Sequence, residues 1–332
     1  MRIGIDLGGT KTEIICLDKN NGRELYRQRV PTVRGDYHAT ITSLKGLIDQ
    51  AEATLKMTGS IGIGIPGTVS RDTGFVKNAN STWLNGKPLD KDLEKALGRP
   101  VRIQNDANCF TVSEATDGAG EGKSIVFGVI IGTGCGGGVV IDGKAHGGVN
   151  GIGGEWGHNP LPYPTIYMPD AKAEYDRFEK VQGATDDTLH HYTTGNVDQA
   201  EYPGPLCYCG RRGCLETWIS GTGFKNDYHR VTGDEVSTHD IIAASKTGDE
   251  KAVAALNRYV DRLARALAGV INILDPDAIV LGGGMSNVSA LYKAVPEAWG
   301  KYVFSDSVHT ELYQAKHGDS SGVRGAAWLW GK

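Results

Sequence analysis

Long apolar runs and an excess of basic charge are both missing from the 332-residue sequence. No stretch approaches the roughly 20 apolar residues of a membrane span, so we predict no membrane partner. Lys and Arg number 35 against 39 Asp and Glu, a formal net charge of -4, which argues against a nucleic-acid partner because phosphate binding needs a basic face. Residues 1–5 read as a strand and lack the features of a signal peptide, which predicts a cytoplasmic protein.

Cysteine is also scarce, with six residues in the chain. Cys16, Cys109 and Cys135 are isolated among apolar or glycine neighbours, where a buried, inert thiol is the usual interpretation. Cys207, Cys209 and Cys214 instead fall within eight residues. In a reducing compartment this density indicates a metal site and not disulfides.

Glycine is abundant, with 47 residues, and it marks two similar turns. Residues 2–17 form two apolar runs around Gly8-Gly9-Thr10-Lys11, and residues 126–142 repeat the plan around residues 132–138. Both patterns predict a β-hairpin, and their repetition suggests two related lobes. The chain length agrees, because 332 residues exceed what one hydrophobic core usually serves.

Between the strands the apolar spacing is helical. Residues 38–57 and 250–274 follow a 3.6-residue period, and a short buried strand is expected at 278–281. Strands that alternate with helices predict an α/β architecture. We expect a first lobe over 1–118, a second over 119–318, and a polar insertion at about 163–205 with one short helix near 171–181.

Three strings imitate nucleotide-binding motifs and are rejected. Residues 62–67 and 132–137 match G-x-G-x-x-G, but neither opens a helix, and a strand follows the P-loop-like residues 118–124. The hairpin turns have a different interpretation, because glycine-rich turns let backbone amides surround phosphate oxygens. One such turn is most simply a plain hairpin; two, with the cluster at 282–284, favour nucleotide binding. Asp6 is then placed to hold magnesium through water.

Asp106 follows a predicted strand and begins a predicted helix, within Asn105-Asp106-Ala107-Asn108. An aspartate at this position is commonly a helix cap or dipole partner. It is also suited to accept a proton from a substrate hydroxyl. From this motif alone the capping role is the simpler interpretation.

His158 and the three clustered cysteines, Cys207, Cys209 and Cys214, supply a closed set of four zinc ligands, the structural type. Zinc would bring the loop that carries Glu155 against the cysteine loop that leads to Glu216. The two carboxylates would then converge as acceptors for sugar hydroxyls.

Together these residues resemble the ROK family of bacterial sugar kinases, within the actin, hexokinase and Hsp70 superfamily. The resemblance spans almost the whole chain and is carried by Asp6-Leu7-Gly8-Gly9-Thr10-Lys11, Gly64-Ile65-Pro66-Gly67, Asn105-Asp106-Ala107-Asn108, Gly132-Thr133-Gly134, residues 154–158, 207–216 and 282–284, and residues 318–327. Residues 78–86 and 317–328 are most similar to the fructokinases, or manno(fructo)kinases, of that family.

The resemblance implies two ribonuclease-H-like lobes with an ATP site in the cleft between them, a last helix within 319–332 that returns to the first lobe, and a homodimer. It implies Asp106 as the catalytic base. Sugar contacts would come from Gly67, Asn80, Asn105, Asp106, Glu155, His158 and Glu216. Nucleotide contacts would come from Gly4, Ile5, Asp6, Leu7, Gly8, Gly9, Thr10, Lys11, Gly132, Thr133, Gly134, Cys135, Gly136, Gly137, Gly138, Val139, Gly282, Gly283 and Gly284.

The expected activity is ATP-dependent phosphorylation of the 6-hydroxyl of D-fructose. The alternatives are the same reaction on N-acetylglucosamine, glucose, mannose or N-acetylmannosamine, because the polar contacts above grip hydroxyls that all of them share. A sugar-responsive repressor of the same family is set aside, because such repressors carry a helix-turn-helix before the first glycine turn, which here starts at residue 6.

Overall fold

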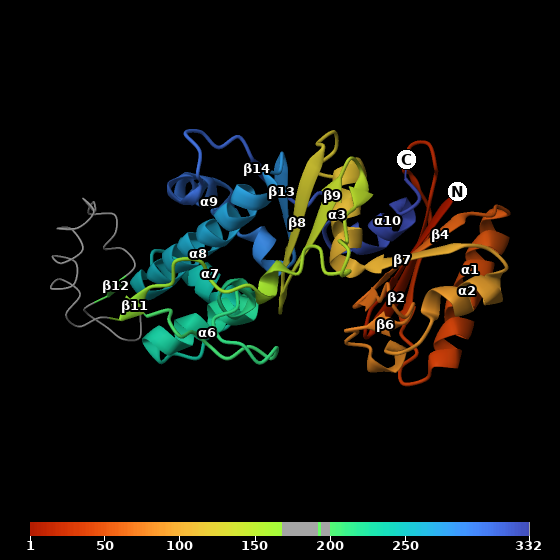
Figure 1. Cartoon of the computed structure of the whole chain (residues 1–332), viewed down its shortest axis with the longest axis horizontal. Coiled ribbons are helices and arrows are strands. Elements are labelled where there is room, and N and C mark those ends of the chain that lie inside the picture. The colour runs from red at the N-terminus through yellow and green to blue at the C-terminus, as the bar shows by residue number, and fades with distance from the viewer. Residues whose placement is uncertain (168–191, 194–199, 332) are drawn as a thin grey trace.

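The computed structural model describes residues 1–167, 192–193 and 200–331, and it forms two lobes that each contain a five-stranded mixed sheet (Figure 1). Both chain ends lie in the same lobe (Figure 1). The predicted two-lobe α/β fold is confirmed. The expected helix near 171–181 lies outside the described residues, and the division of the chain at residue 118 stays a prediction.

The sheet of the first lobe has the order β3-β2-β1-β4-β7. Its strands are β1 (Arg2–Leu7), β2 (Lys11–Leu17), β3 (Glu24–Pro31), β4 (Ser60–Ile65) and β7 (Val101–Asn105). The first three strands are antiparallel, and β4 and β7 run parallel to β1. The predicted hairpin over 2–17 is the β1–β2 pair. Helices α1 (Tyr37–Leu55) and α2 (Leu89–Leu97) complete this core, together with the short pair β5 (Thr68–Val69) and β6 (Val76–Lys77).

The second sheet repeats the plan with the order β10-β9-β8-β13-β14. Its strands are β8 (Ile125–Ile131), β9 (Cys135–Ile141), β10 (Lys144–Ala145), β13 (Ala278–Gly282) and β14 (Glu311–Gln314). Again an antiparallel hairpin, β8–β9, is followed by strands that run parallel to its first member. The two glycine turns therefore occupy equivalent positions in the two lobes, as their sequence repetition predicts.

Helices cover the second sheet, and the longest is α8. They are α5 (Glu216–Ile219), α6 (Gly221–Thr232), α7 (Thr238–Lys246), α8 (Glu250–Leu274) and α9 (Leu291–Trp299). The Asp249 side chain caps α8 at the amide of Ala252, and Asp275 ends it in the left-handed conformation, just before Pro276. Near the outer end of this lobe, β11 (Ile166–Tyr167) pairs in parallel with β12 (Tyr192–Thr193).

Two helices, α3 (Asp106–Asp117) and α10 (Ser321–Trp328), connect the lobes and pack against each other (Figure 1). Helix α10 lies on β1 and β4, whereas α3 lies on β8 and β9. Glycine makes these close approaches possible: a Cβ at Gly62 would overlap the Ala326 carbonyl oxygen, and one at Gly325 would overlap that of Cys109. The sheets therefore meet through a tightly packed helix pair. Among the described residues, no helix is long and apolar enough to cross a membrane.

Candidate active site

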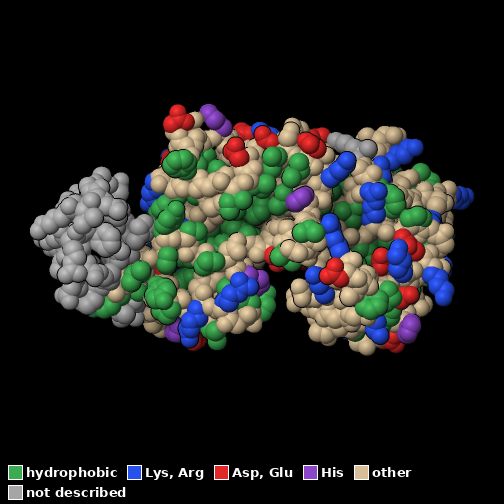
Figure 2. Space-filling view, in the orientation of Figure 1, with side chains coloured by type: hydrophobic (Ala, Val, Ile, Leu, Met, Phe, Trp, Pro, Cys, Tyr) green, Lys and Arg blue, Asp and Glu red, His purple; other side chains and the backbone are tan. Residues whose placement is uncertain are grey.

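A cavity of about 900 Å³ lies between the lobes, where Figure 2 shows a deep notch in the surface. The first lobe contributes the loops after β4 and β6 and the junction of β7 with α3. The second lobe contributes the β8–β9 turn, the 3-10 turn Trp156–His158 and the cysteine loop. Loops and turns of both lobes therefore form the walls of the cavity.

All seven predicted sugar contacts line this cavity: Gly67, Asn80, Asn105, Asp106, Glu155, His158 and Glu216. Six of the predicted nucleotide contacts line it as well: Gly132, Thr133, Gly134, Cys135, Gly136 and Gly137. These residues are spread over 150 positions of the chain, from Gly67 to Glu216, and the fold brings them to one surface. Their individual roles are taken up under the proposed function.

The other predicted nucleotide contacts do not line the cavity. Asp6, Leu7, Gly8, Gly9, Thr10 and Lys11 form the end of β1, the first turn and the start of β2. Gly4 lies beneath α10, whereas Ile5 is fully buried in the core of the first lobe. Gly138 faces α3, and Val139 is buried in the second core. Gly282 packs against the Phe110 ring, and Gly283, at φ +80°, covers the Ile131 backbone just before the second turn, with Gly284 beside it.

Asn105, and not Asp106, is the cap of α3. Its side-chain oxygen accepts hydrogen bonds from the amides of Ala107 at 2.9 Å and Asn108 at 3.4 Å. Asp106 is the first residue of the helix, and its carboxylate also accepts from Ala107, at 2.8 Å. Because Asn105 performs the capping, the carboxylate of Asp106 is not needed for that purpose. It remains accessible from the cavity.

Negative charge outweighs positive charge around the carboxylates in and beside the cavity. Burial, followed by the charges of Asp106 and Glu13, raises the pKa of Asp6 to about 7, although Arg29 opposes the change. Desolvation also raises the pKa of Asp106, against the Ala107 amide, and the charge of Glu155 adds to the rise. Arg211 is the only Lys or Arg among the described residues that line the cavity. The site therefore combines accumulated negative charge with carboxylates that hold protons unusually well.

Glu216 joins the sugar-facing wall to the second glycine turn. One of its carboxylate oxygens accepts from the Cys135 amide at 2.9 Å, and a Cβ at Gly134 would come within 2.7 Å of the same oxygen. The carboxylate thus holds the turn in place and needs glycine at position 134. Its second oxygen is left for a ligand.

The predicted zinc ligands gather beside this wall. One ligand atom from each of His158, Cys207, Cys209 and Cys214 lies within 4.8 Å of the other three. The Cys209 and Cys214 sulfurs are 3.6 Å apart, and His158 Nδ1 is 3.6 Å from the Cys207 sulfur. Tetrahedral zinc with Zn–S bonds near 2.3 Å places its ligand atoms roughly 3.5–3.8 Å apart. The donor set and its spacing fit zinc.

The thiols of the cluster differ in acidity. A backbone amide at Arg211, opposed by desolvation and helped by the neighbouring thiols, lowers the pKa of Cys209 to about 7. The isolated cysteines Cys16, Cys109 and Cys135 are buried and free, as the sequence predicts. Burial and the neighbouring thiols raise the pKa of Cys214 to about 12, so within the cluster the lowered pKa belongs to Cys209.

Tyr208 was missed by the sequence analysis. It lies between two cysteine ligands, and its hydroxyl is 2.9 Å from His158 Nε2. It lines the cavity, as do Arg211 and Asn159. The only sequence signal for Tyr208 is its position between the predicted zinc ligands Cys207 and Cys209, which places its backbone next to the site.

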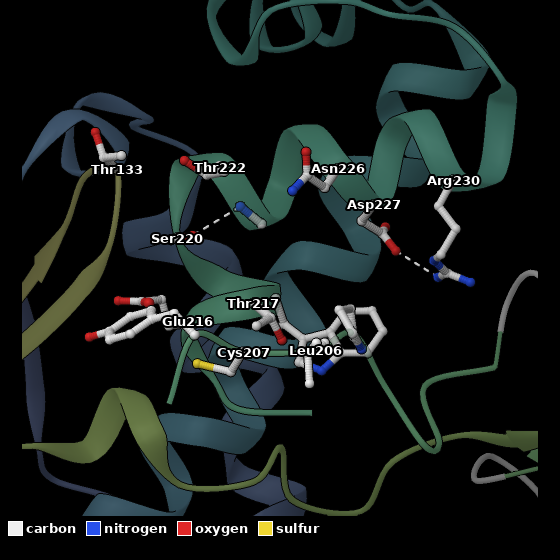
Figure 3. A pocket seen from close by; sticks show the side chains of 14 residues that line it. Thr133, Leu206, Cys207, Glu216, Thr217, Ser220, Thr222, Asn226, Asp227 and Arg230 are labelled. Atoms are coloured by element: carbon white, nitrogen blue, oxygen red, sulfur yellow. Dashed lines mark hydrogen bonds and ion pairs between the residues drawn. The ribbon is translucent and has the colours of Figure 1, made fainter. Parts of the chain in front are cut away.

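A second cavity of about 360 Å³ lies on the far side of the cysteine loop, and Figure 3 shows its walls. Helix α6 forms one side with Thr222, Asn226 and Asp227, while Cys207 and Glu216 form the other (Figure 3). Thr133, Tyr208 and Glu216 line both cavities. The cysteine loop therefore separates two adjoining spaces.

A family model described as the ROK family matches residues 2–332. N-acetyl-D-glucosamine kinases of Haemophilus influenzae and Vibrio cholerae are 36% and 37% identical to the chain over 330 and 331 residues, and each match covers 99% of both proteins. A ROK hexokinase from Thermus thermophilus has a TM-score of 0.78 at 29% identity, covering 99% of this chain and 97% of its own. A ROK glucokinase from Streptomyces griseus, solved with glucose and AMPPNP, has a TM-score of 0.68 at 25% identity, covering 99% and 98%.

The matches and the site agree. The family model leaves only the first residue outside, and the curated relatives are similar over their full length. The repeated lobes, the interlobe cavity and the histidine–cysteine cluster are what the resemblance in the sequence implies. The chain belongs to the ROK family of sugar kinases.

Proposed function

We propose that this protein is an ATP-dependent kinase that phosphorylates N-acetylglucosamine on its 6-hydroxyl. The observation that carries the proposal is the single cavity that joins Asp106, the second glycine turn and the wall formed by Glu155 and Glu216. A base, a phosphate-binding turn and acceptors for hydroxyl groups are the parts that phosphoryl transfer to a sugar requires.

Asp106 is the proposed base. Its raised pKa makes the carboxylate a better proton acceptor than an ordinary aspartate, and its position at the cavity wall leaves it accessible to a bound hydroxyl. As the sugar oxygen forms its bond to the γ-phosphorus, the bond from phosphorus to the β,γ-bridging oxygen breaks and ADP leaves. The hydroxyl proton goes to Asp106.

The nucleotide is proposed to lie along the two glycine turns, with adenosine near residues 282–284. The second turn is fixed from both sides, because the Gly221 amide donates to the Gly132 carbonyl at 2.8 Å and Glu216 holds Cys135. Backbone amides then face the phosphates without a side chain in between. Asp6, at the end of β1, is the proposed holder of a hydrated magnesium ion, which would neutralise phosphate charge.

The sugar is assigned from the relatives and not from the contacts. The full-length relatives named above are N-acetyl-D-glucosamine kinases, which favours this substrate over the fructose expected from the sequence. The segments that carried the fructokinase likeness have structural tasks: Asn85 binds both backbone groups of Ala79, and Arg324 pairs with Asp117 in the interlobe helices. Asn80 of the first segment also lines the cavity, but it is one of the polar contacts that all the candidate sugars share, so the relatives decide the assignment.

A coupled assay of ADP release over N-acetylglucosamine, fructose, glucose, mannose and N-acetylmannosamine tests the proposal. We expect the highest kcat/KM for N-acetylglucosamine. Turnover of fructose alone would reject the substrate and keep the kinase, whereas no ATP-dependent turnover of any sugar would reject the kinase itself.

We further propose that zinc occupies the His158 and cysteine cluster and is structural, because four protein ligands close its coordination shell. Zinc there would fix the cysteine loop, and with it Glu216, against the histidine turn. Metal analysis of the purified protein is expected to give one zinc per chain. Cys209→Ser should lose that zinc and unfold at lower temperature, whereas Cys16→Ala, outside the cluster, should keep it; a stable, zinc-free wild type would reject the site.

A further inference from the structure

Tyr208 forms a hydrogen bond with Nε2 of His158, and both residues belong to the wall of the large cavity. The phenol oxygen is 2.9 Å from Nε2, and the two rings meet edge to face with centroids 5.1 Å apart and an interplanar angle of 83°. His158 and Tyr208 both line the large cavity. The other ring nitrogen, Nδ1, is directed to the metal cluster, 3.6 Å from the Cys207 sulfur.

The direction of this hydrogen bond follows from the ligand set. A histidine binds a metal through the lone pair of one ring nitrogen, so a neutral imidazole that ligates through Nδ1 carries its proton on Nε2. Nε2 therefore donates and the Tyr208 oxygen accepts. The hydrogen bond to the second nitrogen also holds the imidazole ring in the orientation that suits the metal.

A single N–H points in a single direction. A sugar hydroxyl that accepts a hydrogen bond from His158 must therefore take the position that the phenol oxygen now holds. The two acceptors exclude each other at that position. Sugar binding at His158 requires Tyr208 to leave.

Tyr208 is free to leave because little else holds it. The residue is 82% exposed, although Cys207 before it is buried and Cys209 after it is half-buried. An exposed phenol that is displaced from one partner regains hydrogen bonds to water, so the cost of moving it is close to that of one hydrogen bond.

We propose that Tyr208 competes with the sugar for His158 Nε2 and thereby sets the affinity of the enzyme for its sugar. The inference rests on the proposed function, since it takes the large cavity as the sugar site. It makes Tyr208 an affinity-determining residue of the site: it lowers sugar affinity while the metal-bound histidine stays oriented in the empty enzyme.

Tyr208→Phe tests the proposal, because it removes only the competing oxygen. The dissociation constant of the zinc-loaded protein for the best sugar of the panel is measured calorimetrically without nucleotide. We expect about a two- to tenfold lower value in the variant, the equivalent of one hydrogen bond lost from the free state. KM should fall in parallel, with kcat unchanged. Tyr202→Phe, an exposed tyrosine outside the large cavity, is the matched control and should leave the dissociation constant as it is.

Two results overturn the inference. An unchanged dissociation constant means that the phenol does not compete, and a higher one means that Tyr208 donates to the sugar directly. Zinc content and melting temperature equal to those of the wild type establish that the variant is folded. If no sugar of the panel binds the wild type, the proposed function fails instead. If any one of them binds, its dissociation constants for the wild type and Tyr208→Phe can be compared.

Discussion

Asp106 in the cavity wall and Asp6 beside the cavity have carboxylates with raised pKa values, whereas in the second lobe those of Glu201 and Asp227 are lowered. Desolvation acts on all four groups in the same direction, upward. The difference comes from their partners. Asp6 and Asp106 face further carboxylates, while the second pair is surrounded by arginine.

Arg262 is the centre of the second group. It donates to Glu201 at 2.7 Å and to Asp227 at 2.9 Å, and its guanidinium lies 4.5 Å from the centre of the Trp218 ring. Arg265 binds Glu201 through two nitrogens and also the Pro162 carbonyl, at 2.9 Å. Burial alone would raise the pKa of Glu201, but these arginines outweigh it and lower it to about 2.

The contacts of Arg262 and Arg265 indicate their structural role. Glu201 and Pro162 stand near the two ends of the segment expected to be an insertion, and the arginines belong to α8. The paired charges hold those chain ends to the lobe just before the cysteine loop begins. Paired carboxylates thus serve the fold, whereas the raised pKa values of Asp6 and Asp106 are what their proposed roles in the reaction would require, at some cost in stability.

Asp106→Asn tests the proposed role of the carboxylates with raised pKa values, and we expect it to have the largest effect. The substitution keeps the shape of the side chain and removes the proposed base, so we expect kcat to fall by about 10²–10⁴. The melting temperature should be equal or higher, since an unpaired charge is also removed. Steady-state kinetics and thermal melts measure the two effects.

Asp142→Asn is the matched control for that variant. Asp142 lies in the turn after β9 at φ 48°, a conformation that asparagine also adopts, and does not line the cavity. Its kcat should match that of the wild type. Near-normal turnover of Asp106→Asn would show that another group accepts the proton.

Local patterns in the sequence predicted a large part of this molecule. The glycine-turn hairpins, the period of α8 and the three clustered cysteines each depend on spacing that is written within a short stretch. His158, 49 positions before Cys207, joined the predicted zinc set as the fourth ligand that a closed site requires. The resemblance to a family then assigned all seven predicted sugar contacts to what proves to be one cavity. The homodimer stays a prediction.

Features that depend on distant parts of the chain were not predicted. Gly62 and Gly325 are required by helices that approach one another only in three dimensions, and no period marks them. Arg262 looks like any charged residue of an amphipathic helix, but it is 1% exposed because Glu201, 61 positions earlier, neutralises it. Such pairings depend on packing geometry that local spacing does not contain.

Arg262→Met tests the structural role of the carboxylates that are paired with arginine. It leaves two carboxylates in the lobe without their shared partner, and removing one member of a buried ion pair costs about 3–5 kcal/mol. We expect the denaturant midpoint, followed by tryptophan fluorescence, to fall accordingly. Lys301→Met removes an exposed cation that pairs with Asp261, and should cost about 0–1 kcal/mol. Equal losses in the two variants would mean that burial of the pair is irrelevant.

Asp6→Asn tests whether the raised pKa of Asp6 makes the stability of the protein depend on pH. A carboxyl whose pKa rises from 3.8 to about 7 on folding stabilises the protein at low pH, and this contribution is lost as the pH rises through about 7. For the magnesium-free protein we expect the wild type to lose about 2–3 kcal/mol of unfolding free energy between pH 5 and 8 that Asp6→Asn does not lose. Asp49→Asn, on the exposed face of α1, should follow the wild type. Denaturant titrations in zinc-containing buffers measure the unfolding free energy at each pH. If the unfolding free energies of Asp6→Asn and the wild type change with pH in parallel, Asp6 stays ionised in the folded protein, as Glu201 does beside its arginines.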